Sequence, residues 1–403
     1  MACISCGGSR LAPVLSLGKT PLANALLTAE QLARPEPRFA LELVFCPDCS
    51  LVQITERVPP EQLFGEYAYF SSFSDTTVAA AKALAERLAR ERALGPGSLA
   101  MELASNDGYL LRHYRDAGVP VLGIEPAANI ARVANERGIR TRCEFFGREL
   151  AETLAREGCR ADVLHANNVL AHVPDLNGFV SGIERALKPS GVAVIEVPYV
   201  RDLIEKCEFD TIYHEHLCYF SVSALDALFA RHGLGLAGIE RIPAHGGSLR
   251  LFAAPGAPRG AATKVLLDEE RSLGMLELAY YAGFGQRVEK LRRDLVALLA
   301  RLRGEGKRIA AYGASAKGST LLNYFGIDAR HLEYVVDRST EKQGRYTPGT
   351  HLPIVPPERL REDRPDYLLL LAWNFLDEIA AQQAEYRGRG GRFIVPVPEV
   401  RVI

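Results

Sequence analysis

Histidine, glutamate and tyrosine residues gather in one stretch of nine residues, "YHEHLCYFS", at positions 213 to 221. Histidine is the side chain whose unperturbed pKa lies nearest to neutrality, so it can take up a proton at physiological pH. A carboxylate can orient its ring, and a tyrosine hydroxyl can donate a hydrogen bond to a developing negative charge. Tyr213, Glu215 and His216 therefore predict a site of proton transfer.

The local backbone decides whether these residues can cooperate. Glu215 and His216 are neighbours in the chain, and neighbours on a regular strand point to opposite faces of a sheet. We therefore expect them to act together only if this segment is irregular. The alternative is a loop that packs its aromatic rings and leaves the histidines in solvent.

Four cysteines near the amino terminus have the spacing of a metal site. Cys3 and Cys6 form one C-x-x-C pair, and Cys46 and Cys49 form a second. Two such pairs complete a tetrahedral thiolate shell for zinc, and four thiolates leave no open position, so we expect a structural ion. The alternatives are four unrelated cysteines or a redox pair, although no strand–helix–strand unit surrounds either pair.

A polar loop, Ser105-Asn106-Asp107-Gly108, follows a predicted strand, and Glu125 ends the next strand. A carboxylate in that position can accept both ribose hydroxyls of an adenosine. The single glycine and the aspartate disfavour a pyrophosphate but suit the charged amino-acid end of S-adenosylmethionine. The pattern favours S-adenosylmethionine over NAD, and the alternative is a plain turn with a solvated aspartate.

A second glycine-containing loop, residues 313 to 318, also leads from a predicted strand into a predicted helix. It offers backbone donors, the hydroxyl of Ser315 and the ammonium of Lys317 at a helix start, which together suit a diphosphate. Its glycine spacing is not that of a P-loop. The alternative is a tight turn with a surface lysine.

The order of predicted elements divides the chain, which at 403 residues exceeds what one hydrophobic core usually supports. We predict a zinc-binding domain over residues 1–75 and two Rossmann-like α/β domains over 76–256 and 257–403. Strands alternating with helices predict a parallel, doubly wound sheet with ligands at the carboxyl ends of its strands. A long amphipathic helix is expected at about 266 to 303.

The composition excludes several classes of partner. The chain has 48% apolar and 24% charged residues and a formal net charge of −1, which gives no bulk attraction to nucleic acid or to an anionic membrane. No apolar run reaches the length of a membrane span, and the amino terminus lacks a signal-peptide core. We expect a cytoplasmic monomer that binds neither nucleic acid nor membrane.

Behind the Cys₄ start, the motifs "ELASNDGYLL", "NNVLAHVPD", "YHEHLCYFS" and "YGASAKGSTLLNYFG" follow one another in this order. Together they resemble the S-adenosylmethionine-dependent C-methyltransferases that act on nucleotide-linked 4-keto deoxysugars, and the resemblance covers essentially the whole chain. It implies a class I, Rossmann-like methyltransferase core between a zinc-binding domain and a carboxyl-terminal Rossmann-like domain. It also implies that the enzyme removes the C3 proton beside the C4 ketone, and that the resulting enolate carbon receives the methyl group.

The resemblance assigns roles to individual residues. It implies that His216 is the base, that Tyr213 and Glu215 assist it, and that His172 is a further active-site histidine. The residues implied in binding S-adenosylmethionine are Glu102, Ser105, Asn106, Asp107, Gly108, Glu125 and Asn167. Those implied in binding the nucleotide-diphosphate sugar, thymidine diphosphate being the usual nucleotide, are Tyr67, Tyr69, Ser71, Asn168, Ser315 and Lys317.

Three other functions fit parts of the sequence. Methylation at oxygen or nitrogen of a nucleotide sugar would need a base but no group that stabilises an enolate. A nicotinamide-dependent sugar oxidoreductase could use both Rossmann-like halves, but the acidic first loop argues against it. A zinc-knuckle adaptor or nucleic-acid module conflicts with the near-neutral charge.

The cysteine spacing generates the first prediction. Metal analysis of the purified protein should find about one zinc ion per chain, and replacing Cys3 and Cys6 with serine should abolish it, since two remaining thiolates cannot complete the shell. A double variant that retains its full zinc content would contradict the assignment.

Overall fold

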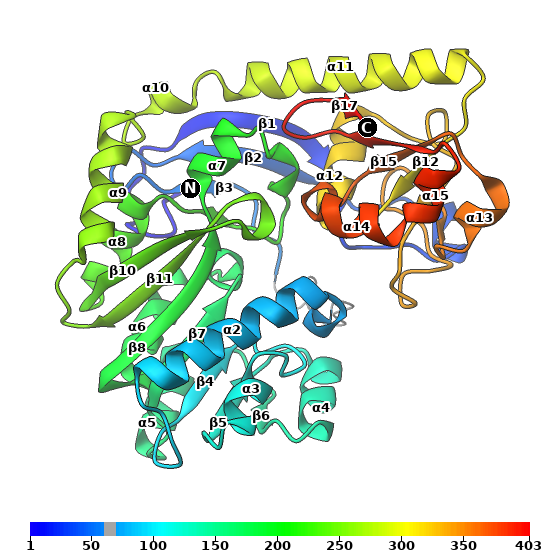
Figure 1. Ribbon diagram of the computed structural model, residues 1–403. Helices are drawn as coiled ribbons and strands as arrows, with labels where there is room; N and C mark the ends of the chain where they lie inside the picture. The colour runs from blue at the N-terminus through cyan, green and yellow to red at the C-terminus, as the bar shows by residue number, and fades with distance from the viewer. Residues whose placement is uncertain (60–69) are drawn as a thin grey trace.

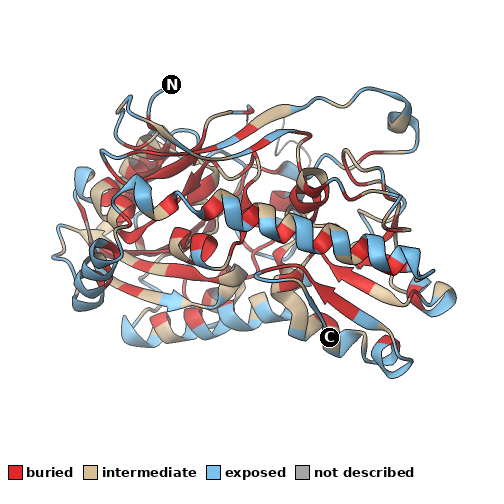
Figure 2. Cartoon of the chain, turned by 90° about the horizontal axis from the view of Figure 1, so that it is seen from above, coloured by how far each residue is buried: buried red, intermediate tan, exposed pale blue. Residues whose placement is uncertain are grey.

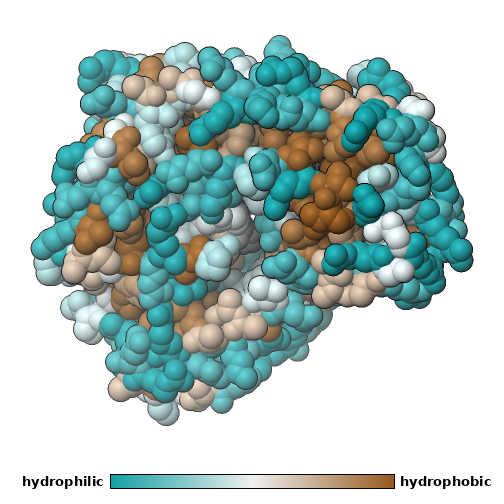
Figure 3. Space-filling model, turned by 45° about the horizontal axis from the view of Figure 1, so that its top comes forward, coloured by the Kyte–Doolittle hydropathy of each residue, from teal (hydrophilic) through white to brown (hydrophobic). Residues whose placement is uncertain are grey.

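The computed structural model describes residues 1–59 and 70–403. These residues form three β-sheets with helices around them (Figure 1). Within these residues, none of the helices combines the length and the apolarity that crossing a bilayer requires. On the face shown in Figure 3, hydrophilic residues predominate and hydrophobic residues form separate patches.

The first sheet joins the amino-terminal region to a later part of the chain. Its antiparallel strands, in the order β1-β2-β3-β9, are β1 (Ala12–Thr20), β2 (Phe39–Phe45), β3 (Val52–Ile54) and β9 (Cys218–Tyr219). One 3-10 turn, η1 (Glu30–Ala33), lies between β1 and β2. In the last pairing, Gln53 lies opposite Cys218 and Val52 opposite Tyr219. The strand after the "YHEH" motif is therefore an edge strand of the amino-terminal sheet.

The second sheet has seven strands in the order β10-β11-β8-β7-β4-β5-β6. Their bounds are β4 (Ala100–Leu103), β5 (Val121–Ile124), β6 (Thr141–Arg142), β7 (Ala161–Asn167), β8 (Leu187–Pro198), β10 (Leu234–Ile242) and β11 (Ser248–Pro255). The pairings from β6 to β8 are parallel, whereas β11 and β10 add antiparallel strands. The doubly wound prediction is confirmed. Its switch point lies between β4 and β7, so the loops after β4, β5 and β7 meet at one edge.

Helices flank this second sheet and connect its strands. They are α2 (Asp75–Glu91), α3 (Leu111–Asp116), α4 (Ala128–Glu136), α5 (Arg148–Arg156), α6 (Leu176–Ala186), α7 (Val200–Glu205), α8 (Val222–Arg231) and α9 (Ala261–Ser272), with 3-10 turns η2 (Ser71–Phe73), η3 (Leu170–His172), η4 (Phe209–Thr211) and η5 (Ala244–Gly246). The Ser74 side chain accepts a hydrogen bond from Thr77 N and so caps the start of α2. A buried hydrogen bond of 2.9 Å between Tyr114 Oη and His165 Nε2 ties α3 to β7.

The third sheet has the order β14-β13-β12-β15-β16-β17, and all of its pairings are parallel except that of β17. Its strands are β12 (Ile309–Tyr312), β13 (Val335–Val336), β14 (Ile354–Val355), β15 (Tyr367–Leu370), β16 (Arg392–Val395) and β17 (Arg401–Val402). The helices around it are α12 (Ala316–Phe325), α13 (Arg359–Asp363), α14 (Leu376–Gln382) and α15 (Ala384–Gly388), with the 3-10 turn η6 (Trp373–Phe375). The predicted second Rossmann-like fold is confirmed.

The prediction of a single long helix at about 266 to 303 is wrong. The chain forms α9, then α10 (Leu278–Tyr281) and α11 (Phe284–Gly304), because Gly274 adopts a left-handed backbone conformation at φ +74° that ends α9. Helix α11 runs along the top of Figure 1 toward the third sheet. Buried and exposed residues alternate along it in Figure 2, and its buried side chains recur every three or four residues.

A buried carboxylate joins α9 to Tyr199 and to the start of α8. Glu270 of α9 is 0% exposed and accepts hydrogen bonds from Tyr199 Oη at 2.8 Å and Val222 N at 2.6 Å. It also accepts from Ser223 N at 2.8 Å and Ser223 Oγ at 2.6 Å. The negative charge lies at the positive end of α8, where four donors compensate for its burial.

This network predicts a large loss of stability on substitution. Glu270→Ala should lower the free energy of unfolding by about 3–5 kcal/mol, because buried donors lose their acceptor, and Glu270→Gln should lose less. The adjacent Glu269, whose ion pair with Arg201 is solvent-exposed, is the control, and Glu269→Ala should cost under about 1 kcal/mol. Equal costs for the two alanine variants in denaturant titrations would contradict this account.

Candidate active site

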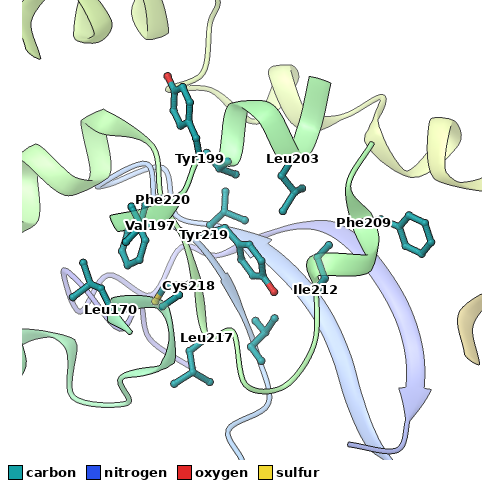
Figure 4. Packing of buried hydrophobic residues seen from close by; sticks show 14 of the residues in the cluster. Leu170, Val197, Tyr199, Leu203, Phe209, Ile212, Leu217, Cys218, Tyr219 and Phe220 are labelled. Atoms are coloured by element: carbon teal, nitrogen blue, oxygen red, sulfur yellow. The ribbon is translucent and has the colours of Figure 1, made fainter. Parts of the chain in front are cut away.

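The "YHEH" motif forms an irregular turn between η4 and β9. The His216 N–H donates to Tyr213 O at 2.9 Å, and Leu217 exchanges backbone hydrogen bonds with two other elements: its N–H donates to Ala171 O at 2.7 Å and its carbonyl accepts from Ile54 N at 3.0 Å. Figure 4 shows Leu217 and the strand that follows it packed among buried side chains. The backbone irregularity that cooperation within the motif requires is therefore present.

The ring of His216 is held from both sides. Its Nδ1 lies 2.8 Å from Thr211 O, and its Nε2 lies 2.9 Å from Tyr213 Oη. A backbone carbonyl can only accept, so Nδ1 must carry a proton. In the neutral ring Nε2 then carries the lone pair and accepts from the Tyr213 hydroxyl. The geometry presents Nε2 as the basic atom, and Thr211, which sequence reasoning missed, fixes the tautomer.

The second histidine predicted for the site lies against the first. The rings of His172 and His216 meet edge to face, with centroids 4.7 Å apart. Burial lowers the pKa of His172 to about 4, so this ring is neutral at pH 7. His214, in contrast, lies within 3.1 Å of Ala40 O through its Nε2. The turn therefore brings His172, Tyr213 and His216 together and directs His214 toward the amino-terminal sheet.

Glu215 contacts a different part of the chain from His216. Glu215 is 4% exposed, and its carboxylate accepts a hydrogen bond from Asn24 Nδ2 at 2.7 Å. Burial raises the pKa of Glu215 to about 7. The Thr211 carbonyl thus orients the imidazole of His216, whereas Asn24 holds the carboxylate of Glu215. Nothing in the sequence pointed to Asn24, because it lies 191 residues before Glu215 in the chain.

The loop after β4 is folded around Glu125. The two oxygens of this carboxylate accept from Asn106 N and Ala127 N, each at 2.9 Å. Asp107 is not solvated: its side chain is 0% exposed and pairs with Arg137 at 2.6 Å. Gly108 has φ +78°, and a Cβ there would lie 2.7 Å from Ile139. The alternative of a plain turn with a solvated aspartate is therefore wrong.

Buried oxygens at the switch-point edge have no hydrogen-bond partner among the described residues. They belong to Glu102, Ser105, Asp107, Asn167 and Asn168. Burial, together with the charges of Glu125 and Asp107, raises the pKa of Glu102 well above its usual value. Such acceptors fit a ligand that brings hydroxyl and ammonium donors, as the ribose and amino-acid ends of S-adenosylmethionine do.

Ser71 lies against the loop after β4, since its backbone N–H donates to Asn106 Oδ1 at 2.9 Å. Tyr67 and Tyr69, predicted as substrate contacts with Ser71, lie outside the described residues.

The second glycine loop packs against η4. Ser315 Oγ accepts from Gly318 N at 3.1 Å and caps α12. Lys317 places its ammonium 4.7 Å from the centroid of the Trp373 ring, so it is not a lysine surrounded by solvent. Trp373 Nε1 in turn donates to Asp210 Oδ2 at 2.6 Å.

Two buried carboxyl groups therefore lie near Lys317. Burial raises the pKa of Asp210 to about 6 and that of Glu208 to about 7, although the Lys317 ammonium opposes both shifts. Thr320 of α12 donates to Ile212 O at 3.2 Å. The residues that hold His216 and those around Lys317 are thus neighbours, a relation that the sequence did not reveal.

The four predicted metal ligands converge. Cys3 and Cys49 place their sulfurs 3.6 Å apart, as do Cys6 and Cys46, and all four sulfurs lie within 4.8 Å of one another. A zinc–sulfur bond of about 2.3 Å puts the sulfurs of a tetrahedral shell about 3.8 Å apart. The cluster therefore fits a zinc ion.

The raised pKa of Glu215 predicts a pH dependence of stability. A carboxyl group with a raised folded-state pKa stabilises the fold below its unfolded pKa and loses this contribution as the pH rises through the folded value. Relative to Glu215→Gln, the wild-type protein should therefore lose on the order of 3 kcal/mol of unfolding free energy between pH 5 and pH 8. Denaturant titrations across this range measure it. The exposed control Glu91→Gln should run parallel to wild type, and a parallel profile for Glu215→Gln would overturn the prediction.

Three family models match the chain in succession. A putative zinc binding domain matches residues 3–64, a methyltransferase domain 77–237, and a C-methyltransferase C-terminal domain 243–398. Together with the sheet order, the second match shows a class I methyltransferase fold.

Relatives agree with these matches. C-methyltransferase NovU of Streptomyces niveus is 38% identical over 404 residues, which cover 100% of this chain and 96% of the relative. Sterol 4-C-methyltransferase strm-1 of Caenorhabditis elegans is 27% identical over 141 residues, covering 34% of this chain and 40% of the relative.

Solved structures resemble the chain over about half its length. Magnesium protoporphyrin IX methyltransferase from Synechocystis PCC 6803 aligns with a TM-score of 0.35 at 14% identity, covering 48% of this chain and 88% of that one. The PH0226 protein from Pyrococcus horikoshii OT3 aligns with a TM-score of 0.38 at 16% identity, covering 49% and 98%. The full-length match to NovU and the three domain matches show that the chain belongs to the family of S-adenosylmethionine-dependent C-methyltransferases with a zinc-binding amino-terminal domain.

Proposed function

We propose that the chain methylates C3 of a nucleotide-linked 4-keto deoxysugar, within deoxysugar biosynthesis. The observation that carries the proposal is the arrangement of Thr211, His216 and Tyr213, in which one imidazole nitrogen is held protonated and the other is left basic. A carbon-bound proton beside a ketone needs such a base together with a donor for the enolate oxygen.

Base and donor are coupled through one hydrogen bond. The Tyr213 hydroxyl donates to His216 Nε2 while that atom carries its lone pair. When Nε2 takes the substrate proton it can no longer accept, and the hydroxyl must find another acceptor. The enolate oxygen develops its charge in the same step and supplies that acceptor. Proton removal at carbon and stabilisation at oxygen thus occur together.

The surroundings favour a transient positive charge on His216. The Thr211 carbonyl accepts from Nδ1 and stabilises the protonated ring. His172 is neutral because burial lowers its pKa to about 4, so it adds no repelling charge next to His216. His172 therefore acts here as a neutral neighbour of the base.

For the methyl donor, we assign the edge formed by the loops after β4, β5 and β7. S-adenosylmethionine, when bound, supplies the electrophilic methyl group. Glu125 would orient the ribose. The buried oxygens of Glu102, Asp107 and Asn167 that have no partner in the described part of the chain would accept from donors of the ligand. Carboxylates at this edge also favour a cationic ligand over an anionic one.

For the nucleotide diphosphate, we assign the loop of Ser315 and Lys317, at the positive end of α12. Glu208 and Asp210 lie near this loop, and their raised pKa values let them take up protons near neutrality. Proton uptake would lessen their repulsion of a diphosphate. Thymidine diphosphate as the nucleotide, the monomeric state, the cytoplasmic location and the domain boundaries at 75 and 256 stay predictions.

Substitution of Glu125 tests the assignment of the donor site. Glu125→Ala should weaken S-adenosylmethionine binding roughly 10- to 150-fold in calorimetry, since a lost charged hydrogen-bond partner costs about 1.5–3 kcal/mol. Glu136→Gln, an exposed change on the neighbouring α4, should bind like wild type. Unchanged affinity of a folded Glu125→Ala protein would place the donor elsewhere.

Substitution within the motif tests the reaction itself. His216→Asn should retain ligand binding but slow both deuterium exchange at C3 and methyl transfer by about 10²- to 10⁴-fold. Tyr213→Phe should slow the same steps by about 10²-fold, because it lacks the hydroxyl for the enolate. Deuterium exchange at C3 in the absence of S-adenosylmethionine also distinguishes carbon methylation from methylation at oxygen or nitrogen.

His214→Asn is the matched control, since this histidine contacts the Ala40 carbonyl and should leave the rate per folded molecule unchanged. Wild-type exchange in His216→Asn would mean that another group takes the proton, with His172 as the next candidate.

A further inference from the structure

A buried glutamine lies beside the first cysteine pair. Gln53 of β3 is 1% exposed, and its Oε1 accepts from Ile4 N at 2.9 Å. An amide N–H can only donate, so the oxygen of the Gln53 side chain must face Ile4. Its Nε2 must then point elsewhere, and this buried donor has no partner among the described residues. Leaving an amide donor unpaired in an interior is costly, so its surroundings call for an acceptor.

Ile4, whose N–H the Gln53 oxygen accepts, belongs to the first cysteine pair. Ile4 lies between Cys3 and Cys6, whose sulfurs belong to the metal cluster. Four thiolates around Zn²⁺ carry an excess negative charge, and outer hydrogen bonds to metal ligands commonly offset and orient them.

We propose that Gln53 is a positioning residue whose Nε2 donates to a thiolate of the shell once zinc is bound. Cys3, the chain neighbour of Ile4, is the thiolate that we assign. One amide group then holds the backbone and a metal ligand of the same C-x-x-C pair.

This residue also connects the metal to the proposed active site. Gln53 lies opposite Cys218 of β9, and its neighbour Ile54 donates to Leu217 O at 3.0 Å. Leu217 directly follows His216. The zinc shell and the turn that carries the proposed base are therefore fixed to the same three-residue strand. The link between the zinc shell and the catalytic base depends on the proposed function, whereas the hydrogen bond to the thiolate does not.

Gln53→Glu is the sharpest test, because it keeps the size and the acceptor for Ile4 N but replaces the donor with an oxygen. Loss of an outer-shell partner typically costs 10- to 100-fold in metal affinity. We expect zinc transfer to a chromophoric chelator to show that loss, and the thiolate-to-metal absorption of the cobalt-substituted protein to shift. Gln53→Met, which removes the donor without adding charge, should change both readouts in the same direction.

Gln31→Glu is the matched control: Gln31 also accepts a backbone N–H, from Thr28 at 2.8 Å, but on the exposed surface. It should match wild type in both measurements. Wild-type affinity and spectrum in the Gln53 variants would overturn the proposal.

A measurement on the unsubstituted protein removes any dependence on how the variants fold. With ¹¹³Cd in the zinc site, an N–H···S bond should give a scalar coupling between the metal and the side-chain amide protons of Gln53. A spectrum that resolves these protons without such a coupling would overturn the proposal. Neither readout involves methyl transfer, so failure here is distinguishable from failure of the proposed reaction. If both hold, Gln53→Glu should also lower kcat for methylation while leaving S-adenosylmethionine affinity unchanged.

Discussion

The pairing of β9 with β3 is the constraint on which the geometry of the proposed active site depends. A turn on its own would leave His216 without a fixed position, and reactive groups need support within fractions of an ångström. Here the turn is fixed at its end by the amino-terminal sheet and at its start by η4, where Asp210 and the following Ile212 contact the third domain. The segment from 209 to 219 is thus held by β3 of the first sheet, by η3, and by α12 and η6 beside the third sheet.

Buried acidic groups lie within this segment and directly before it, and they give it an unusual electrostatic character. Glu208, Asp210 and Glu215 all have pKa values raised toward neutrality by burial. Near pH 7 such groups change charge at small energetic cost, so the site can accommodate substrates and intermediates whose charge differs. The buried carboxylate of Glu270 has a different environment, because it accepts hydrogen bonds from four donors.

The sequence was most informative where a pattern is local. The Cys3–Cys6 and Cys46–Cys49 spacings predicted the cluster, and the alternation of strands and helices predicted both Rossmann-like sheets, because each depends on residues close together in the chain. Partners from distant segments could not be predicted in this way. Asn24, Trp373 and Arg137 were identified only from tertiary contacts. The break at Gly274 was missed for another reason, since the amphipathic pattern continues on both sides of the glycine.

The contacts between η4 and α12 have a consequence for how these enzymes can be recombined. Trp373 and Thr320 of the third domain hold Asp210 and Ile212, the residues on either side of the carbonyl that orients His216. A chimaera that takes its last domain from a relative therefore exchanges part of the support of the base along with the glycine loop. Such hybrids should be active only when both sides of this contact come from the same parent. The crossover point should therefore lie before residue 208, or the contacting residues of both parts should be exchanged together.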